Sequence, residues 1–117
     1  MPPDSSSALS NLEFHVMLAL TKGPLYGYAV KERVEQESAH ALAPRAGSLY
    51  RVLARLMTAG LVTEAEPEEA LQPHPGLARR YYALTPEGRR ALAAEAQRLR
   101  AAAALAENRL GTAGSRT

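Results

Sequence analysis

The sequence contains no cysteine and no tryptophan, and only one of its 117 residues is phenylalanine. Without cysteine, disulfide bonds and thiolate metal sites are excluded. The three histidines are scattered along the chain without a carboxylate partner at ligand spacing, so we expect no metal site. The chain also lacks a glycine-rich phosphate loop, and Ser48 lacks the flanking pattern of a catalytic serine elbow. These absences argue against an enzyme and against a bound cofactor.

Long apolar runs are missing as well. No stretch approaches the roughly 20 apolar residues that span a bilayer, and residues 1–7 lack the basic-then-apolar order of a secretory signal. We therefore expect a cytoplasmic protein without a membrane partner. The length fits one domain, and a hydrophobic content of 46% is enough for a small core.

The net charge of +2 is too small to indicate a nucleic-acid partner by itself, but the acidic residues are unevenly distributed. No acid occurs within residues 38–63 or within residues 70–86. The arginines inside these two windows are Arg45, Arg51, Arg55, Arg79 and Arg80. The windows predict a positive face suited to phosphate contacts.

The first window contains a predicted amphipathic helix over residues 47–59. Its apolar residues recur at the three-and-four spacing of one helix face and are Leu49, Val52, Leu53, Leu56 and Met57. At about 100° per residue, Arg51 and Arg55 lie one turn apart on the other side, together with Ser48. Two arginines on one helix face more often indicate an ordinary solvated surface than a binding site, but the elements that follow favour contact with DNA.

A β-hairpin is predicted directly after this helix. Gly60 provides the left-handed position that ends many helices, and strands are predicted over residues 61–63 and 78–84. The intervening loop carries four glutamates that would repel phosphate, so we expect any insertion of this loop into DNA to be shallow or confined to its side from Gly76 to Arg80. Because Arg79 and Arg80 point to opposite faces of a strand, at most one of them can face DNA.

Three further helices surround this unit. Helices are predicted over residues 9–20 and 26–37, and Thr85 followed by Pro86 opens a last helix over residues 86–110. The predicted fold is therefore mainly α with a small β-hairpin, a winged helix-turn-helix followed by a C-terminal dimerisation helix. We assign the winged domain to residues 8–85, the dimerisation helix to residues 86–110, and mobile ends to residues 1–7 and 111–117.

Four short motifs resemble, in order and spacing, the signatures of PadR-type transcriptional regulators. They are Leu12–Phe14, Gly23–Tyr28, Gly47–Tyr50 and Arg80–Gly88. The resemblance covers roughly residues 12–92, and the single helix after the wing is similar to the short branch of that family. It implies a homodimeric winged-helix repressor that binds double-stranded DNA at a near-palindromic operator. An inducer, which the sequence does not identify, would act by changing the separation of the two recognition helices.

The candidate DNA-binding residues come from the helix predicted over residues 47–59, which is the proposed recognition helix, and from the segments around it. They are Tyr26, Lys31, Arg45, Ser48, Tyr50, Arg51, Arg55, Arg79 and Arg80. Several have an alternative structural role. Ser48 could cap the local backbone, Tyr50 could be half-buried packing, and one of Tyr26 and Tyr28 is expected in the core.

The last helix has a seam of small and aliphatic residues at alternating four-and-three spacing, as expected of a helix lying along a partner. An alanine-rich helix stabilised by propensity alone is the alternative, but it would expose its leucines. The first helix has two apolar stripes, which predicts two neighbours. The expected dimer interface comprises Leu12, Phe14, Val16, Leu92, Ala96, Leu99, Ala103, Ala106 and Leu110. A protein-interaction module with an incidental basic face is the second functional reading.

Overall fold

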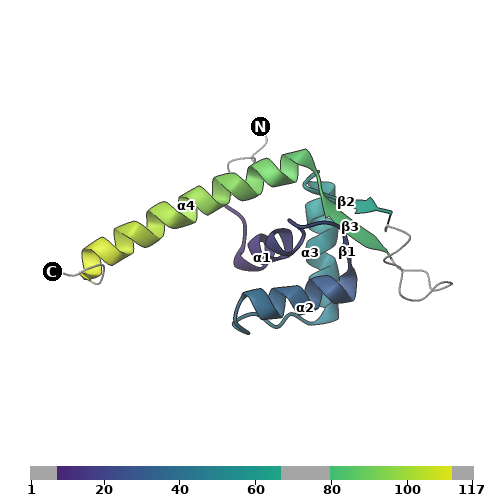
Figure 1. Cartoon of the computed structure of the whole chain (residues 1–117), viewed down its shortest axis with the longest axis horizontal. Coiled ribbons are helices and arrows are strands. Elements are labelled where there is room, and N and C mark those ends of the chain that lie inside the picture. The colour runs from purple at the N-terminus through teal and green to yellow at the C-terminus, as the bar shows by residue number, and fades with distance from the viewer. Residues whose placement is uncertain (1–7, 67–79, 112–117) are drawn as a thin grey trace.

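The computed structural model describes residues 8–66 and 80–111 of the chain. The described residues form four helices and three strands. In Figure 1 the last and longest helix runs away from the small sheet and from the other helices, which gather beside it. The helices are α1 (Asn11–Ala19), α2 (Gly27–Glu37), α3 (Ala46–Thr58) and α4 (Pro86–Leu110), and the strands are β1 (Leu25–Tyr26), β2 (Val62–Ala65) and β3 (Tyr81–Leu84). This arrangement confirms the predicted fold class. Of the predicted mobile ends, 1–7 and 111–117, all residues except Gly111 lie outside the described residues, as does most of the predicted loop; Gly111 forms the C-cap of α4.

Helix α3 has the two-sided character that its sequence predicts. Leu49, Leu53 and Leu56 are buried in the core, and Met57 packs against its edge. They meet Val16 and Met17 from α1 and further apolar side chains from α2. Because one stripe of α3 is fixed in this core, its opposite face is held toward solvent.

The sheet has three strands in the order β1-β3-β2, so the predicted two-stranded hairpin was incomplete. The additional strand β1 pairs antiparallel with β3, with Leu25 opposite Tyr82 and Tyr26 opposite Tyr81. Two residues are too short to show the alternation that identifies a strand in sequence. Strand β1 is held instead by hydrogen bonds to a partner more than fifty positions away, and no local pattern reports that pairing.

Specific caps fix both ends of the domain. Ser10 and Glu13 form a capping box, in which the Ser10 hydroxyl accepts a hydrogen bond from the Glu13 backbone N–H at 3.0 Å and Glu13 accepts one from the Ser10 N–H at 2.8 Å. This cap starts α1 at Asn11, two residues later than predicted. At the other end, Thr85 caps α4 as predicted.

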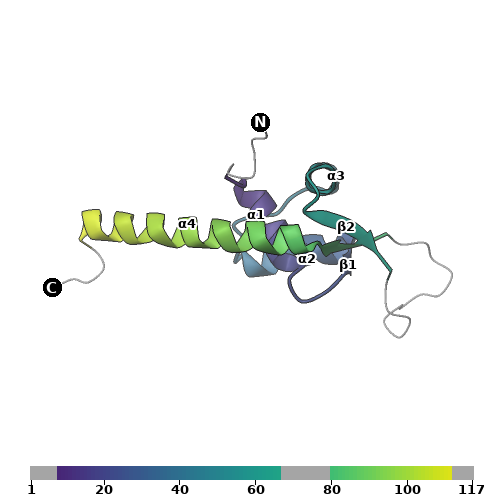
Figure 2. The same cartoon turned by 90° about the horizontal axis from the view of Figure 1, so that it is seen from above.

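Hydrogen bonds hold the start of α4 against the winged domain. The Thr85 hydroxyl donates to the Gly60 carbonyl at 2.7 Å, and Arg89 donates to the Thr21 carbonyl at 3.1 Å. From Gln97 to Gly111 every residue is exposed. Figure 2 shows this part of α4 extending as a straight rod beyond the other helices. Among the described helices, none combines the length and apolar character needed to cross a bilayer.

Candidate nucleic-acid interface

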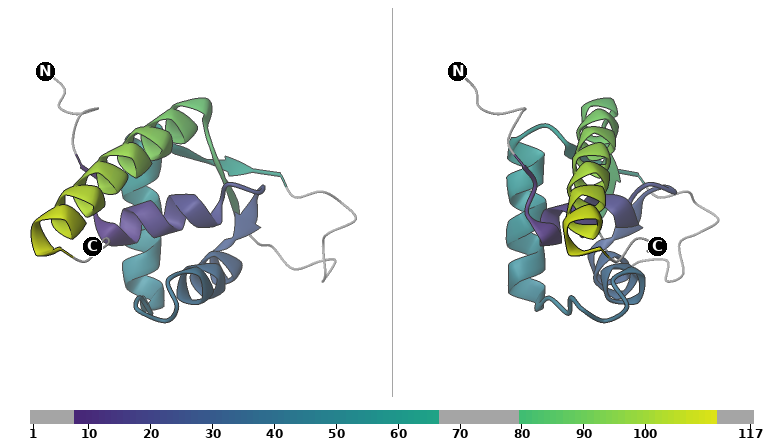
Figure 3. Two further views of the ribbon diagram at one scale, coloured as in Figure 1. Left: turned by 60° about the vertical axis from the view of Figure 1, so that its left-hand side comes forward. Right: turned by 90° about the vertical axis from the view of Figure 1, so that its left-hand side faces the viewer.

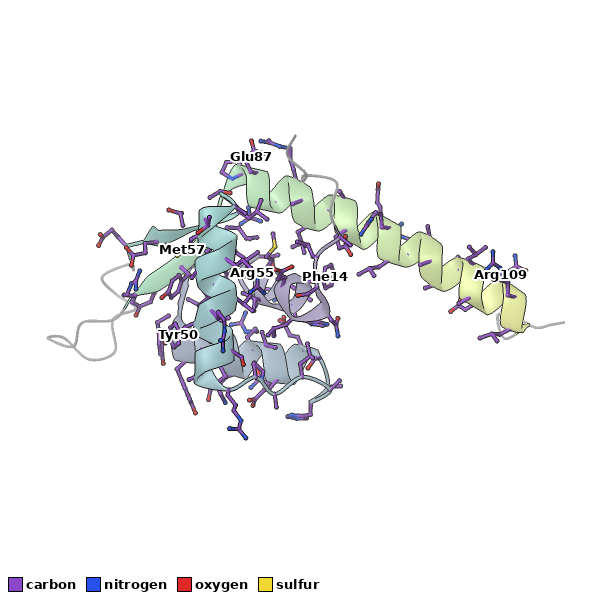
Figure 4. The ribbon with its side chains drawn as sticks, turned by 180° about the vertical axis from the view of Figure 1, so that it is seen from behind. Phe14, Tyr50, Arg55, Met57, Glu87 and Arg109 are labelled. Atoms are coloured by element: carbon purple, nitrogen blue, oxygen red, sulfur yellow. The ribbon has the colours of Figure 1, made fainter. Side chains whose placement is uncertain are left out.

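Helix α3 runs along one edge of the molecule, so the other elements lie on one side of it only (Figure 3, right). Its uncovered face presents Gly47, Arg51, Ala54 and Thr58, all of which are exposed. Figure 4 shows Arg55 on the flank of α3 that faces α1 and Tyr50 on the opposite flank. We call this exposed side of α3 the recognition face. Arg51 lies near its centre, and Arg55 and Tyr50 lie at its two margins.

Among the candidate cations that the structure describes, Arg45 and Arg51 have no acidic partner in the described part of the chain. Both are exposed, and neither forms an ion pair within residues 8–66 and 80–111. Arg45 occupies the N-cap position of α3, where the first backbone N–H groups of the helix also point outward. Both guanidinium groups can therefore reach an external phosphate or base edge without first breaking an ion pair.

Arg55 is not free in this way, because Glu13 from α1 reaches it. The Arg55 Nε lies 3.0 Å from Glu13 Oε2. Burial acts to raise the pKa of Glu13, but the hydrogen bonds from the Ser10 backbone and from Arg55 outweigh it, and the net shift is downward. Residues 38–63 contain no acidic residue of their own, but the folded chain still places an acidic side chain beside them. In space, a carboxylate from another helix lies against α3.

Arg80 has a similar arrangement beside the sheet. Its Nε pairs with Glu64 on β2, and its guanidinium carbon lies 5.8 Å from the centre of the Tyr82 ring. The hydrogen bond to Glu64 raises the pKa of Arg80 further, so it remains charged. Arg79, the other wing candidate, lies outside the described residues. The predicted repulsion by the wing acids is therefore partly offset, because Glu64 is engaged by Arg80.

Lys31 is paired within its own helix. Its Nζ lies 2.9 Å from Glu35 Oε2 and 6.0 Å from the centre of the exposed Tyr28 ring. The hydrogen bond to Glu35 raises the pKa of Lys31. Both side chains are half-buried, and a pair one turn apart on a helix contributes little to stability, so it can exchange for a phosphate at small cost.

The tyrosines gather where β1, α2 and α3 meet. Tyr26 packs edge-on against Tyr81, with ring centres 5.7 Å apart, whereas Tyr28 is exposed. Tyr50 lies across the backbone of Gly27, and a Cβ added there would come within 2.1 Å of its hydroxyl oxygen. Nearly half of Tyr50 remains exposed, and its hydroxyl makes no hydrogen bond within the described residues. The hydroxyl end of the ring therefore packs against Gly27, as the packing alternative predicts, while the exposed half of the side chain leaves room for the phosphate contact of the other alternative.

Ser48 does not act as a cap. The N-cap of α3 is Arg45, and the half-buried Ser48 hydroxyl makes no hydrogen bond to any described residue. The capping alternative is therefore not supported.

The candidate dimer residues separate into two groups. Val16 was assigned wrongly, because its side chain is fully buried in the core of its own chain and cannot meet a partner. Leu92 is also buried within the chain, at 8% exposure, because it packs into the core from the first part of α4. Leu12 and Phe14 are half-buried at the core edge, as is Ala96 on α4. The exposed members are Leu99, Ala103, Ala106 and Leu110.

The seam predicted for the last helix missed two features of α4. Leu105 is an exposed leucine on a different face from Leu99, so the exposed apolar surface is wider than one stripe. Glu95 is buried and pairs with Arg98 at 2.7 Å. Neither was visible from heptad spacing, which considers only one face of the helix.

The histidines offer no catalytic or metal constellation among the described residues. No group of three histidine, aspartate or glutamate side chains comes together there to hold a metal ion. His15 instead packs edge-on against Phe14, with ring centres 5.6 Å apart.

Comparison with known proteins places this geometry in a family. The family model for the PadR-like transcriptional regulators matches residues 16–94, which is more than half of the chain. An uncharacterised 37.1 kDa protein of transposon TN4556 from Streptomyces fradiae is 43% identical over 81 residues. That alignment includes 69% of this chain and 21% of the other protein, so the chain spans about a fifth of that relative's length.

Solved structures share the fold. A PadR family transcription regulator from Clostridium difficile R20291 superposes with a TM-score of 0.71 at 24% identity, covering 87% of this chain and 100% of that one. Bacillus subtilis PadR in complex with operator DNA gives a TM-score of 0.58 at 24% identity, covering 71% of this chain and 45% of that one. The family assignment predicted from four short motifs is confirmed, as is the prediction that the protein is not an enzyme. The chain therefore belongs to the PadR-like family of transcriptional regulators.

Proposed function

We propose that this regulator binds double-stranded DNA by placing α3 in the major groove. The observation that carries the proposal is the uncovered face of α3, on which Arg51 is exposed and has no ion-pair partner among the described residues, while the opposite stripe is fixed in the core. A rigid helix with its polar face outward is the usual reader of base edges. Arg45 and the Tyr50 hydroxyl would contact the phosphates that border the groove.

We further propose that two copies act together as a repressor on a near-palindromic operator. The support is the exposed half of α4, where Leu99 and Leu110 are 45% and 74% exposed. A second copy would cover these leucines and hold two α3 helices at a fixed separation. Repression would then follow from occupancy of the operator, and an inducer would act by altering that separation. This role fits the cytoplasmic location expected from the sequence.

The first test concerns Arg51. Arg51→Ala should weaken binding to a duplex selected from a random pool by about 1–3 kcal/mol, because a guanidinium on a base edge contributes that much discrimination. Its unfolding midpoint should stay unchanged, since the side chain is exposed and makes no ion pair with the described residues. Fluorescence anisotropy measures the affinity. Arg90→Ala on α4 is the matched control, and equal losses in both variants would contradict a specific role for Arg51.

The second test separates DNA binding from a protein-interaction module with an incidental basic face. If a dimer neutralises about four to eight phosphates, the logarithm of its affinity should fall against the logarithm of salt concentration with a slope of about −4 to −7. The acidic partners of Lys31, Arg55 and Arg80 favour the shallower end of that range. A labelled duplex titrated across a salt series measures the slope. Affinity that is absent at low salt or indifferent to salt would favour the interaction module.

A further inference from the structure

Arg55, at one margin of the recognition face, forms an ion pair with Glu13, an acid that lies outside the helix-turn-helix. Glu13 lies on α1, 42 positions before Arg55 in the chain, and their side chains meet at 3.0 Å. The Glu13 side chain is 16% exposed, whereas the Arg55 side chain is 54% exposed. The acid is thus the mostly covered member of the pair, and the arginine, labelled on α3 in Figure 4, is the more exposed member.

The carboxylate of Glu13 is held at both oxygens. Oε1 accepts the Ser10 backbone N–H at 2.8 Å as part of the α1 capping box, and Oε2 accepts the Arg55 Nε–H at 3.0 Å. The hydrogen bonds that lower the pKa of Glu13 keep it ionised at neutral pH. Glu13 is therefore a rigid acceptor, since the helix cap fixes its position independently of Arg55.

Only one of the nitrogen atoms of Arg55 is used in this contact. Because Glu13 engages Nε, the two terminal amino groups keep their four N–H donors. Within residues 8–66 and 80–111, neither terminal group makes a hydrogen bond. A guanidinium held at its inner edge presents its outer edge in a fixed orientation, which suits a phosphate or base that accepts two hydrogen bonds.

We propose that Glu13 is a positioning residue for DNA recognition, which holds Arg55 by its Nε and at the same time offsets its charge. The proposal rests on the proposed DNA-binding function. Holding the side chain reduces the rotamer freedom that Arg55 would lose on binding, which favours the sequence that matches its orientation. Offsetting its charge reduces the attraction to any phosphate backbone, which lowers affinity for unrelated DNA. Both effects raise the ratio of specific to non-specific affinity.

The test is Glu13→Gln, which removes the charge but keeps a side-chain oxygen for the Ser10 cap. Two labelled duplexes are used, one recovered by selection from a random pool and the other a scrambled sequence of the same composition. We expect affinity for the scrambled duplex to rise about threefold and the specific-to-scrambled ratio to fall about fivefold, since non-specific binding follows charge and specific binding follows orientation.

Two controls separate positioning from general effects of charge and stability. Glu87→Gln removes the acid of another exposed arginine pair, that of Arg90 on α4, and should leave the affinity ratio unchanged. In an Arg55→Gln background, Glu13→Gln should have no further effect on the ratio, because there is no guanidinium left to position. A ratio that Glu13→Gln leaves unaltered, or an effect that persists in the Arg55→Gln background, overturns the proposal.

These outcomes are distinct from failure of the proposed function. If the unchanged protein bound neither duplex at low salt, the DNA-binding assignment itself would fail. If the unchanged protein discriminated between the duplexes and Glu13→Gln discriminated equally well, only the positioning role would fail.

Discussion

Leu99→Glu is expected to convert the proposed dimer into monomers. Leu99 lies on the exposed part of α4, and 45% of it is exposed in the single chain. The substituted chain should therefore fold. In the dimer, however, each copy would place a carboxylate without a partner in an apolar helix contact.

The expected penalty is large compared with the stability of a small interface. An unpaired buried carboxylate costs about 3 kcal/mol or more, so the dimer dissociation constant should rise by at least about a hundredfold. Affinity for the selected duplex should fall with it, because a monomer engages only one half-site. Sedimentation at micromolar concentration measures the first effect, and anisotropy measures the second.

Gln97→Glu is the matched control for this substitution. Gln97 is exposed and, being two residues away, lies about 200° around the helix from Leu99. It introduces the same charge on the other side of α4 and should leave the oligomeric state unchanged. A Leu99→Glu variant that still sediments as a tight dimer would mean that the copies associate through another surface.

Gly88→Ala is expected to destabilise the folded chain strongly, although alanine is the better helix former. Gly88 is buried where α4 crosses the backbone before β2, and an added Cβ would lie 2.1 Å from the Leu61 carbonyl oxygen. That oxygen accepts the Thr85 N–H at 3.1 Å, so it cannot move away without losing a hydrogen bond at the start of α4. The first turn of α4 would have to shift instead.

The clash should exceed the gain in helix propensity. Alanine in place of glycine gains about 1 kcal/mol in a helix, whereas overpacking against backbone together with a lost hydrogen bond costs about 4 kcal/mol. We expect a net loss of about 3 kcal/mol and a melting temperature lower by more than about 10 °C. Thermal unfolding followed by circular dichroism, at fixed protein concentration, measures this change.

Gly47→Ala, in contrast to Gly88→Ala, is expected to stabilise the folded chain. Gly47 is also helical, but a Cβ added there meets no atom within 4 Å. The propensity gain of about 0.5–1 kcal/mol should then appear as stabilisation. Similar melting temperatures for Gly88→Ala and Gly47→Ala would contradict the close approach of α4 to Leu61.

Local patterns were sufficient for most of the fold. The stripe from Leu49 to Leu56 predicted which face of α3 enters the core, and the sequence of Thr85 and Pro86 predicted where α4 begins. Gly60 adopts the left-handed conformation, with φ of 80°, that its place after a helix predicted. These features depend on residues within one or two turns of each other, so their spacing in the sequence reports them directly.

The sequence by itself therefore determined the helices, the wing strands and the candidate cations, because each depends on local periodicity or residue type. Only the tertiary structure decided which of those cations are free. Glu13 and Glu64 lie outside the acid-free windows or at their edge, yet the packing of α1 on α3 and the pairing of β2 with β3 bring them to Arg55 and Arg80. The same applies to Val16, whose apolar character was evident but whose neighbour was not. Electrostatic and packing partners are set by distances in space, and a linear pattern of charges does not contain them.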